Sequence, residues 1–215
     1  MKTIKLFLAS SEELKPERLV IAEMVTQLNY SLAKFNVAIR LVKWEYLDSS
    51  MGVQHKQEDY NDYLRQCDMC VVLFWTKFGM YTEIELKLAY ELMMSNSKLK
   101  NFCVLFKNSS NMTPQLQSFI DRFGQEHPDY CYSFLDEAEL KQRLSKMIEG
   151  AVNDKFEQEY KTLSNEVRKL NKLLSVTEDD DPDKGDYLDE LHHLENELMN
   201  NRLIVEDIKN KIVNI

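Results

Sequence analysis

The sequence lacks the excess of basic residues that proteins which bind nucleic acids carry. Its 215 residues include 27 Lys and Arg against 36 Asp and Glu, so the formal net charge is −9. A polyanion such as DNA or RNA attracts basic surfaces and is repelled by acidic ones. We therefore expect no nucleic-acid partner.

The sequence also lacks a long apolar run. No stretch approaches the roughly 20 apolar residues that a helix needs to cross a bilayer. The apolar part of residues 1–10 is too short for a signal peptide and is typical of a β-strand instead. We expect a soluble, cytoplasmic protein with no membrane partner.

Cysteine is scarce, and its spacing does not complete a metal site. Of the four cysteines, Cys67 and Cys70 form a C-x-x-C pair, a spacing found in metal and redox sites. No second pair and no paired histidines accompany it, and it runs directly into an apolar segment. We expect no bound metal ion and reduced thiols.

Short apolar segments alternate with helical patterns through residues 1–150. Five of them are strand candidates, at residues 4–9, 37–44, 69–75, 101–107 and 130–134. The third has no polar interruption, which is typical of a central strand buried on both faces. Strands spaced by helices predict an α/β fold, with a five-stranded parallel sheet of flavodoxin-like order and right-handed crossovers.

Residues 151–215 are highly charged and have no strand pattern. Apolar residues recur there at alternating spacings of four and three, from Phe156 to Leu174 and from Tyr187 to Ile212, with Asn201 in the second series. Such heptad seams predict two helices joined by an acidic turn, as an α-helical hairpin or a coiled coil. Pairing within one chain and pairing between chains both remain open. The residues expected to be buried include Leu163, Leu170, Leu191 and Leu198.

The third strand candidate leads into a segment that carries a carboxylate. Gly79 follows the strand, and Thr82 and Glu85 have the spacing of an N-cap and its capping-box partner. This predicts that Glu85 lies in the first helical turn, just beyond the carboxyl end of a buried strand. Ligands bind at that edge of open parallel sheets. A role in capping alone is the alternative for Glu85.

The order of these motifs over residues 1–150 resembles a Toll/interleukin-1 receptor (TIR) domain. The first strand ends in Phe7-Leu-Ala9-Ser-Ser11, a Trp-Glu loop follows the second, and Phe-Gly-x-Tyr-Thr-x-x-Glu-Leu follows the third. More narrowly, the chain is similar to the bacterial TIR-like domains at the head of prokaryotic defence proteins. TIR enzymes carry a Trp-x-x-x-Glu motif with a catalytic glutamate. Tyr81-Thr-Glu-Ile-Glu85 stands at that place, with tyrosine in place of tryptophan.

The resemblance implies an enzyme that cleaves the nicotinamide N-glycosidic bond of NAD⁺, giving ADP-ribose or a cyclic form, in anti-phage defence. NAD⁺ is the substrate, and no further cofactor is implied. Glu85 is the implied catalytic residue. Glu83 is the competitor, but it lies two residues earlier and points about 200° around the helix. The expected substrate contacts are Phe7, Ala9, Ser10, Ser11, Trp44, Gly79, Tyr81 and Thr82.

Several of these contacts have structural alternatives. Ser10 and Ser11 are suited to hold the pyrophosphate at a helix N-terminus, or only to cap that helix. Trp44 is equally consistent with a core position. The loop at residues 44–54 corresponds to the BB loop of TIR domains, which often bridges subunits. The resemblance therefore implies activity that depends on self-association through TIR surfaces, and the helical tail offers a second route.

Two other functions are compatible with the same residues. One is a non-catalytic TIR scaffold, which binds other TIR domains and uses Glu85 only as a cap. The other is an enzyme similar to nucleoside deoxyribosyltransferases, which share the flavodoxin-like layout and use a glutamate nucleophile. The second expects a compact oligomer without a heptad tail, so it fits this sequence less well.

Overall fold

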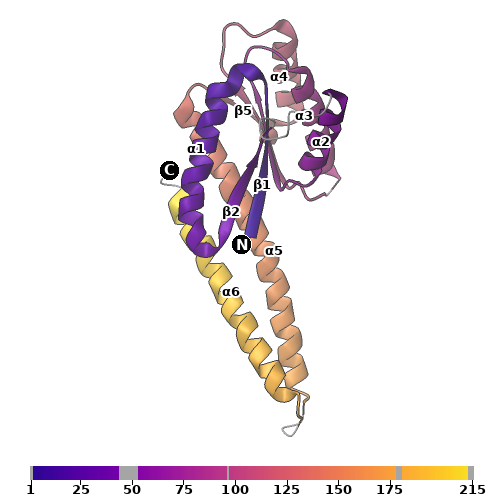
Figure 1. The fold of residues 1–215 in the computed structure, drawn as a ribbon, viewed down its shortest axis with the longest axis vertical. Helices are drawn as coiled ribbons and strands as arrows, with labels where there is room; N and C mark the ends of the chain where they lie inside the picture. Colours follow the sequence, from indigo (N-terminus) through magenta and orange to yellow (C-terminus); the bar gives the residue numbers. More distant parts are fainter. Residues whose placement is uncertain (1, 44–52, 96, 178–180, 213–215) are drawn as a thin grey trace. The chain divides into compact units, whose positions relative to one another are not determined.

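A computed structural model describes residues 2–43, 53–95, 97–177 and 181–212 of the chain (Figure 1). The chain forms two compact units, residues 1–151 and residues 152–214. Among the described helices, none combines the length and the apolar character that crossing a membrane requires.

The first unit is built on a five-stranded sheet in which every neighbouring pair of strands is parallel. The strands are β1 (Lys2–Ser10), β2 (Val37–Val42), β3 (Met69–Phe74), β4 (Asn101–Lys107) and β5 (Cys131–Phe134). Their order across the sheet is β2-β1-β3-β4-β5. This confirms the predicted α/β fold of flavodoxin-like order. All six residues of β3 are inaccessible to solvent, as expected for the central strand.

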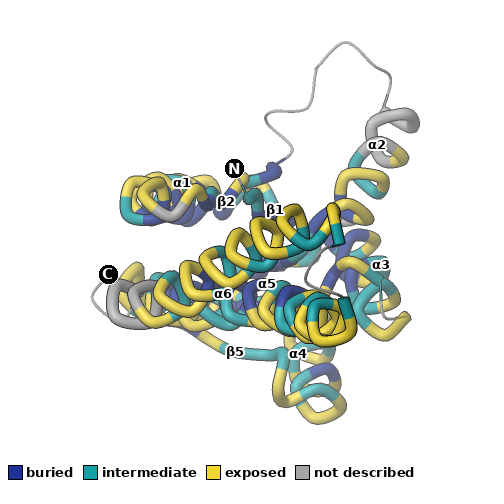
Figure 2. Tube along the Cα trace, turned by 90° about the horizontal axis from the view of Figure 1, so that it is seen from below, coloured by how far each residue is buried: buried dark blue, intermediate teal, exposed yellow. Residues whose placement is uncertain are grey.

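Helices cover both faces of this sheet. They are α1 (Lys15–Leu32), α2 (Val53–Arg65), α3 (Met80–Met94), α4 (Pro114–Glu126) and α5 (Glu137–Leu174). One face packs an apolar core against α2, α3 and α4, through Leu64, Leu86 and Leu116 among others. Helix α1 and the first turns of α5 cover the other face (Figures 1 and 2).

Two helix starts follow the capping signals in the sequence. Thr113 is the N-cap of α4 and its side chain accepts from the Leu116 backbone N–H, with Pro114 at the first helical position. Asp136 stands before α5, and its Oδ1 accepts from the backbone N–H of Glu139 at 3.0 Å. Helices α4 and α5 thus each begin at a side-chain oxygen that accepts a hydrogen bond from a first-turn backbone N–H, a group with no partner inside the helix.

Helix α3 starts three residues earlier than the capping box predicted. Gly79 is its N-cap, in an extended conformation, and Glu83 N–H donates to Gly79 O at 3.1 Å. The prediction of Thr82 as the cap is therefore wrong, and Glu85 lies in the second turn rather than the first. A Cβ at residue 79 would stand 2.9 Å from Thr82 Oγ1. Only glycine leaves room for Thr82 to fold back against the start of the helix.

The second unit consists of residues 152–174 of α5 and of α6 (Lys184–Ile212), which run antiparallel side by side (Figure 1). Leu163 and Asn201 are buried, and Leu170, Leu191 and Leu198 are half-buried. Exposed residues follow the outer sides of both helices (Figure 2). The two helices thus pair within the chain, as the heptad seams predicted for a hairpin.

Candidate active site at the carboxyl edge of the sheet

The loop after β1 meets the start of α3 at the carboxyl edge of the sheet. Ser10, the last residue of β1, pairs with Leu73 near the end of β3. A Cβ at Gly79 would stand 3.5 Å from the Cβ of Ser11. Four of the residues predicted to contact a substrate, Ser10, Ser11, Gly79 and Thr82, therefore lie in one place although about 70 residues separate the two segments.

Glu13 holds these two segments together. Its Oε1 accepts hydrogen bonds from the Thr76 backbone N–H at 3.0 Å and from the Ser11 hydroxyl at 3.2 Å, and its Oε2 accepts from the Thr76 hydroxyl. Partial burial acts to raise the pKa of Glu13. The hydrogen bonds from Thr76, Ser11 and the Lys77 backbone outweigh burial, so the pKa lies below its ordinary value.

A buried arginine lies beneath the Ser10–Ser11 turn. Arg18, on α1, is 1% exposed. Its Nη1 donates to Ser10 Oγ at 3.1 Å and to the Ser11 carbonyl at 2.7 Å, and its Nη2 contacts Glu12 at 3.4 Å. The hydroxyls of Ser10 and Ser11 are thus both hydrogen-bonded within the protein, and a cation stands directly behind the turn.

A second cation stands at the end of β4. Lys107 Nζ lies 2.5 Å from Glu17 Oε1 and 4.1 Å from the centroid of the Trp75 ring. Lys107 is the last residue of β4 and Trp75 follows the adjacent strand β3, so this ion pair with α1 belongs to the same edge of the sheet as the Ser10–Ser11 turn.

Glu85 is the most unusual ionisable group of the first unit. Its side chain is 7% exposed, and among the described residues it accepts no hydrogen bond and forms no ion pair. Burial raises the pKa of Glu85 to about 8. It lies over β3, where burial, Cys67 and Glu85 together raise the pKa of the Cys70 thiol far above its ordinary value. Burial disfavours the ionised form of this group, and carboxyl groups with strongly raised pKa values are candidates for a functional role.

Glu83, the alternative carboxylate, has the opposite environment. Its side chain is 45% exposed and pairs with Lys87 of the next helical turn at 2.9 Å. Such exposed pairs contribute little to stability and hold no group in place for chemistry. Comparison with known proteins adds no assignment: no protein-family model and no curated protein matches this chain. The case for a site rests on the residues themselves.

The other predicted contacts are placed as follows. Phe7 and Ala9 are buried in the apolar core that faces α2, α3 and α4, so a substrate meets them only through their backbone or through a rearrangement of that core. Thr82 is 3% exposed. Trp44, the loop up to Gly52 and the side chain of Tyr81 lie outside the described part of the structure.

Glu13, Arg18, Lys107 and Trp75 were not among the predicted site residues. Arg18 precedes Ile21 and Val25 at helical spacing, and this position on the apolar face of α1 was the available signal for its burial. Glu13 and Lys107 carry no local signal, because their partners are 63 and 90 residues away.

No group of three His, Cys, Asp or Glu side chains in the described residues is placed to hold a metal ion. The four cysteines are free thiols, and Cys67, Cys70 and Cys103 are buried. Burial raises the pKa of Cys67 and of Cys103 to about 12. These thiols are therefore protonated, and their place in the molecule is that of small core residues.

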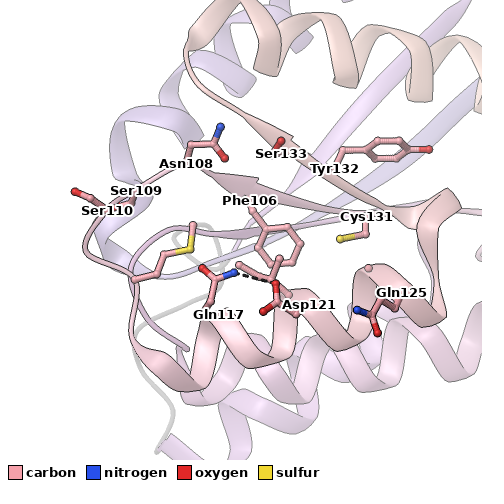
Figure 3. Close-up of a pocket in the computed structure, with 13 residues that line it drawn as sticks. Phe106, Asn108, Ser109, Ser110, Gln117, Asp121, Gln125, Cys131, Tyr132 and Ser133 are labelled. Carbon is pink, nitrogen blue, oxygen red and sulfur yellow. Dashed lines mark hydrogen bonds between the residues drawn. The ribbon is translucent and has the colours of Figure 1, made fainter.

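A cavity that Glu85 does not line lies between α4 and the ends of β4 and β5 (Figure 3). It measures about 830 Å³ and combines an apolar floor at Phe106 with amides and hydroxyls such as Asn108, Ser133 and Gln117. Gln117 Nε2 donates to Asp121 Oδ1 at 3.0 Å across its α4 wall. None of the described residues that line it is a cation, so they offer no charge complementary to a pyrophosphate.

Proposed function

We propose that the first unit is a TIR-like NAD⁺ nucleosidase, with Glu85 as the catalytic carboxylate. One observation carries the proposal: on the helix that follows the central strand, Glu85 is 7% exposed and its burial raises its pKa to about 8. The motifs that resemble TIR domains point to the same residue. The resemblance further assigns the activity to anti-phage defence, with ADP-ribose or a cyclic form as the product.

The chemistry of NAD⁺ suits a single carboxylate. Nicotinamide leaves as a neutral molecule from a cationic substrate, so the leaving group needs no strong general acid. Positive charge then develops on the ribose as the glycosidic bond breaks, in an oxocarbenium-like transition state. A fixed Glu85 carboxylate stabilises that charge, and its low-dielectric surroundings strengthen the interaction.

Glu85 must be ionised to act in this way. Because burial raises its pKa to about 8, the free protein carries it mostly protonated at pH 7. A cation within about 4–6 Å favours the charged form of a carboxylate. The nicotinamide ring of NAD⁺ is such a cation, so substrate binding itself ionises Glu85 and its proton leaves to solvent.

The pyrophosphate is assigned to the turn after β1. The buried guanidinium of Arg18 donates to the Ser10 hydroxyl and to the Ser11 carbonyl, pairs with Glu12 at 3.4 Å, and so holds the turn in place. Glu13 holds this turn against the start of α3 through Thr76. The nicotinamide riboside and the pyrophosphate of NAD⁺ would thereby be held by two segments that Glu13 links.

The test is nicotinamide release from NAD⁺ by concentrated full-length protein, with Glu85→Gln and Glu83→Gln as a matched pair. We expect Glu85→Gln to lose about 10²-fold or more of the rate, as for removal of one group aimed at transition-state charge. Glu83→Gln should retain the wild-type rate, because Glu83 faces solvent. Equal loss in both variants would show that the wrong residue has been assigned.

The alternatives give different results in the same assay. A non-catalytic scaffold releases no nicotinamide at any protein concentration but still self-associates. A deoxyribosyltransferase-like enzyme exchanges bases between deoxyribonucleosides and leaves NAD⁺ intact. Dependence on assembly is tested by following release per milligram of protein across a dilution series, where a flat line would show that one subunit carries a complete site.

A further inference from the structure

The cavity beside the edge strand β5 is walled by one side of α4 and by the loop that follows β4. Gln117, Asp121 and Gln125 follow one another at intervals of four residues along that side of the helix, and all three are exposed (Figure 3). At one end α4 comes so near to β5 that a Cβ on Gly124 would stand 3.4 Å from Cys131 Sγ. The volume of about 830 Å³ lies within the range of about 300–1,000 Å³ that small-molecule sites occupy.

The floor of this cavity is apolar and is held by the core behind it. Phe106 is 2% exposed, and its ring stacks on that of Phe74, with centroids 5.7 Å apart and an interplanar angle of 17°. Met112 and Ile120, which are half-buried, line the cavity beside it and pack against the same core. A flat ring laid on this floor buries apolar surface without any rearrangement of the core.

The polar groups around the floor are mostly neutral. They include the carboxamides of Asn108, Gln117 and Gln125 and the hydroxyls of Ser109, Ser110 and Ser133. Asp121 is the one charged residue among the described residues that line the cavity, and its Oδ1 accepts from Gln117 Nε2 at 3.0 Å. The second carboxylate oxygen of Asp121 and the second N–H of Gln117 take no part in that bond. The lining thus offers donors and acceptors side by side, and its one charge repels anions.

Side chains of these kinds recognise the edges of nucleobases. Asparagine and glutamine bind the amino group and N7 of adenine in pairs, and aspartate accepts from amino groups of bases. We propose that this cavity binds an uncharged adenine nucleoside, with its base on Phe106 and the edge of the base at Gln117 and Asp121. The proposal is independent of the proposed function, because it uses neither Glu85 nor the turn after β1.

The experiment is calorimetric titration of the full-length protein with adenosine and inosine. Inosine keeps the ribose and the fused rings of adenosine but carries a carbonyl in place of the amino group. We expect adenosine to bind at least about tenfold more tightly than inosine, because the carboxylate of Asp121 accepts from an amino group and repels a carbonyl oxygen. Asp121→Asn should narrow this preference, because a carboxamide also donates to the inosine carbonyl.

A matched pair of variants on α4 tests the residues themselves. Gln117→Ala/Asp121→Ala is compared with Gln115→Ala/Glu126→Ala, which removes the same kinds of group at exposed positions that are not among the described lining residues. We expect the first variant to bind adenosine at least about tenfold more weakly than wild type, and the control to bind it within about twofold. Alanine is the best helix former, so both variants should fold, and thermal melting checks this. Glu85→Gln should bind adenosine as wild type does, which separates this cavity from the proposed NAD⁺ site.

Cys131 reports whether adenosine occupies the cavity. Its thiol lines the cavity and is half-buried, whereas the other three thiols are buried. Saturating adenosine should slow the alkylation of Cys131 at least about threefold. An unchanged rate would overturn the proposal, as would equal affinity for adenosine and inosine or an absence of adenosine binding up to millimolar concentration. Tighter binding of AMP than of adenosine would also overturn it, because the site would then recognise a phosphate, and so would an equal loss of affinity in the control pair.

Discussion

The carboxylate of Glu13 accepts hydrogen bonds from both the backbone N–H and the hydroxyl of Thr76. These bonds connect the loop after β1 to the loop after β3. These loops lead into α1 and α3, the helices that carry Arg18 and Glu85. The two residues of this pair are 63 positions apart in the sequence.

Replacing Glu13 by glutamine should weaken the fold and change its response to acid. Hydrogen bonds to a charged group contribute about 1.5–3 kcal/mol, and we expect a loss of about that size in the free energy of unfolding at pH 7. Because folding lowers the pKa of Glu13, its stabilisation is present above the ordinary carboxyl pKa and disappears as the pH falls through the lowered value. Urea unfolding between pH 3 and 7 measures this.

The matched variant is Thr76→Val, which removes the hydroxyl but keeps the backbone amide. It should lose part of the stability that Glu13→Gln loses, and the double variant should lose less than the sum of the two, because the side chains share one interaction. Additive losses would show that the two side chains act independently.

Glu85 should make the protein less stable as the pH rises. Folding raises its pKa from 4.5 to about 8, so between these values the folded state binds the proton that the unfolded state has released. The contribution is about 1.4 kcal/mol per pH unit of stability lost on going from pH 5 to 8. Glu85→Gln should remove this slope and be the more stable protein at pH 8. Superimposable pH profiles for the two proteins would mean that Glu85 is hydrated in solution.

Binding of NAD⁺ at pH 7 should release close to one proton per site. The reason is that the free Glu85 is protonated and the bound one is ionised by the cationic ring. Calorimetric titration in two buffers with different ionisation enthalpies gives the number of protons released. Glu85→Gln should release none, and wild-type KM should rise as the pH is lowered from 8 to 6. A buffer-independent binding enthalpy would contradict the proposed role of this carboxylate.

A chain that ends at residue 151 should fold as an α/β protein. It keeps all five strands and the α5 residues Leu140, Leu144 and Ile148, which are buried. Circular dichroism and urea unfolding of the shortened chain test this. Light scattering on both lengths then shows whether the hairpin joins subunits. Equal subunit numbers for the two forms would exclude assembly through the tail.

The sheet was predictable because each strand is short, apolar and bounded by polar residues, and β4 was predicted at its observed bounds. The start of α3 was not, since the spacing of Thr82 and Glu85 fits a capping box whether or not the helix begins there. The start of the helix depends on the close packing at Gly79, where a Cβ would meet Thr82 Oγ1 and the Cβ of Ser11 from the distant loop after β1. The change of unit was predicted at residues 150–151, next to the observed boundary, but the sequence did not show that α5 continues through it as one helix of 38 residues.

Long-range polar contacts were the least predictable part of the site. A charged residue on an amphipathic helix normally faces water, so Arg18 gave no sign of the serine turn that it holds. The environment of Glu85 was equally hidden, because the helix face predicts its burial but not which described side chains lie near it. The sequence therefore singles out Glu85 only as a candidate, and its raised pKa follows from the structure.

Because three of the four thiols are buried, the rate at which each cysteine is alkylated reports on the unfolding of the sheet. Cys67 lies just before the central strand β3 and Cys70 is its second residue, and neither has any accessible surface. Cys131, on the edge strand β5, is half-buried, and the pKa of its thiol is raised only to about 11. An alkylating reagent attacks the thiolate, so it must wait for the sheet to open. Cys131 should be modified first, by local fraying, and Cys70 only in molecules that have unfolded globally. The order of labelling, read by mass spectrometry, would time the loss of the sheet from its edge to its centre without any introduced probe.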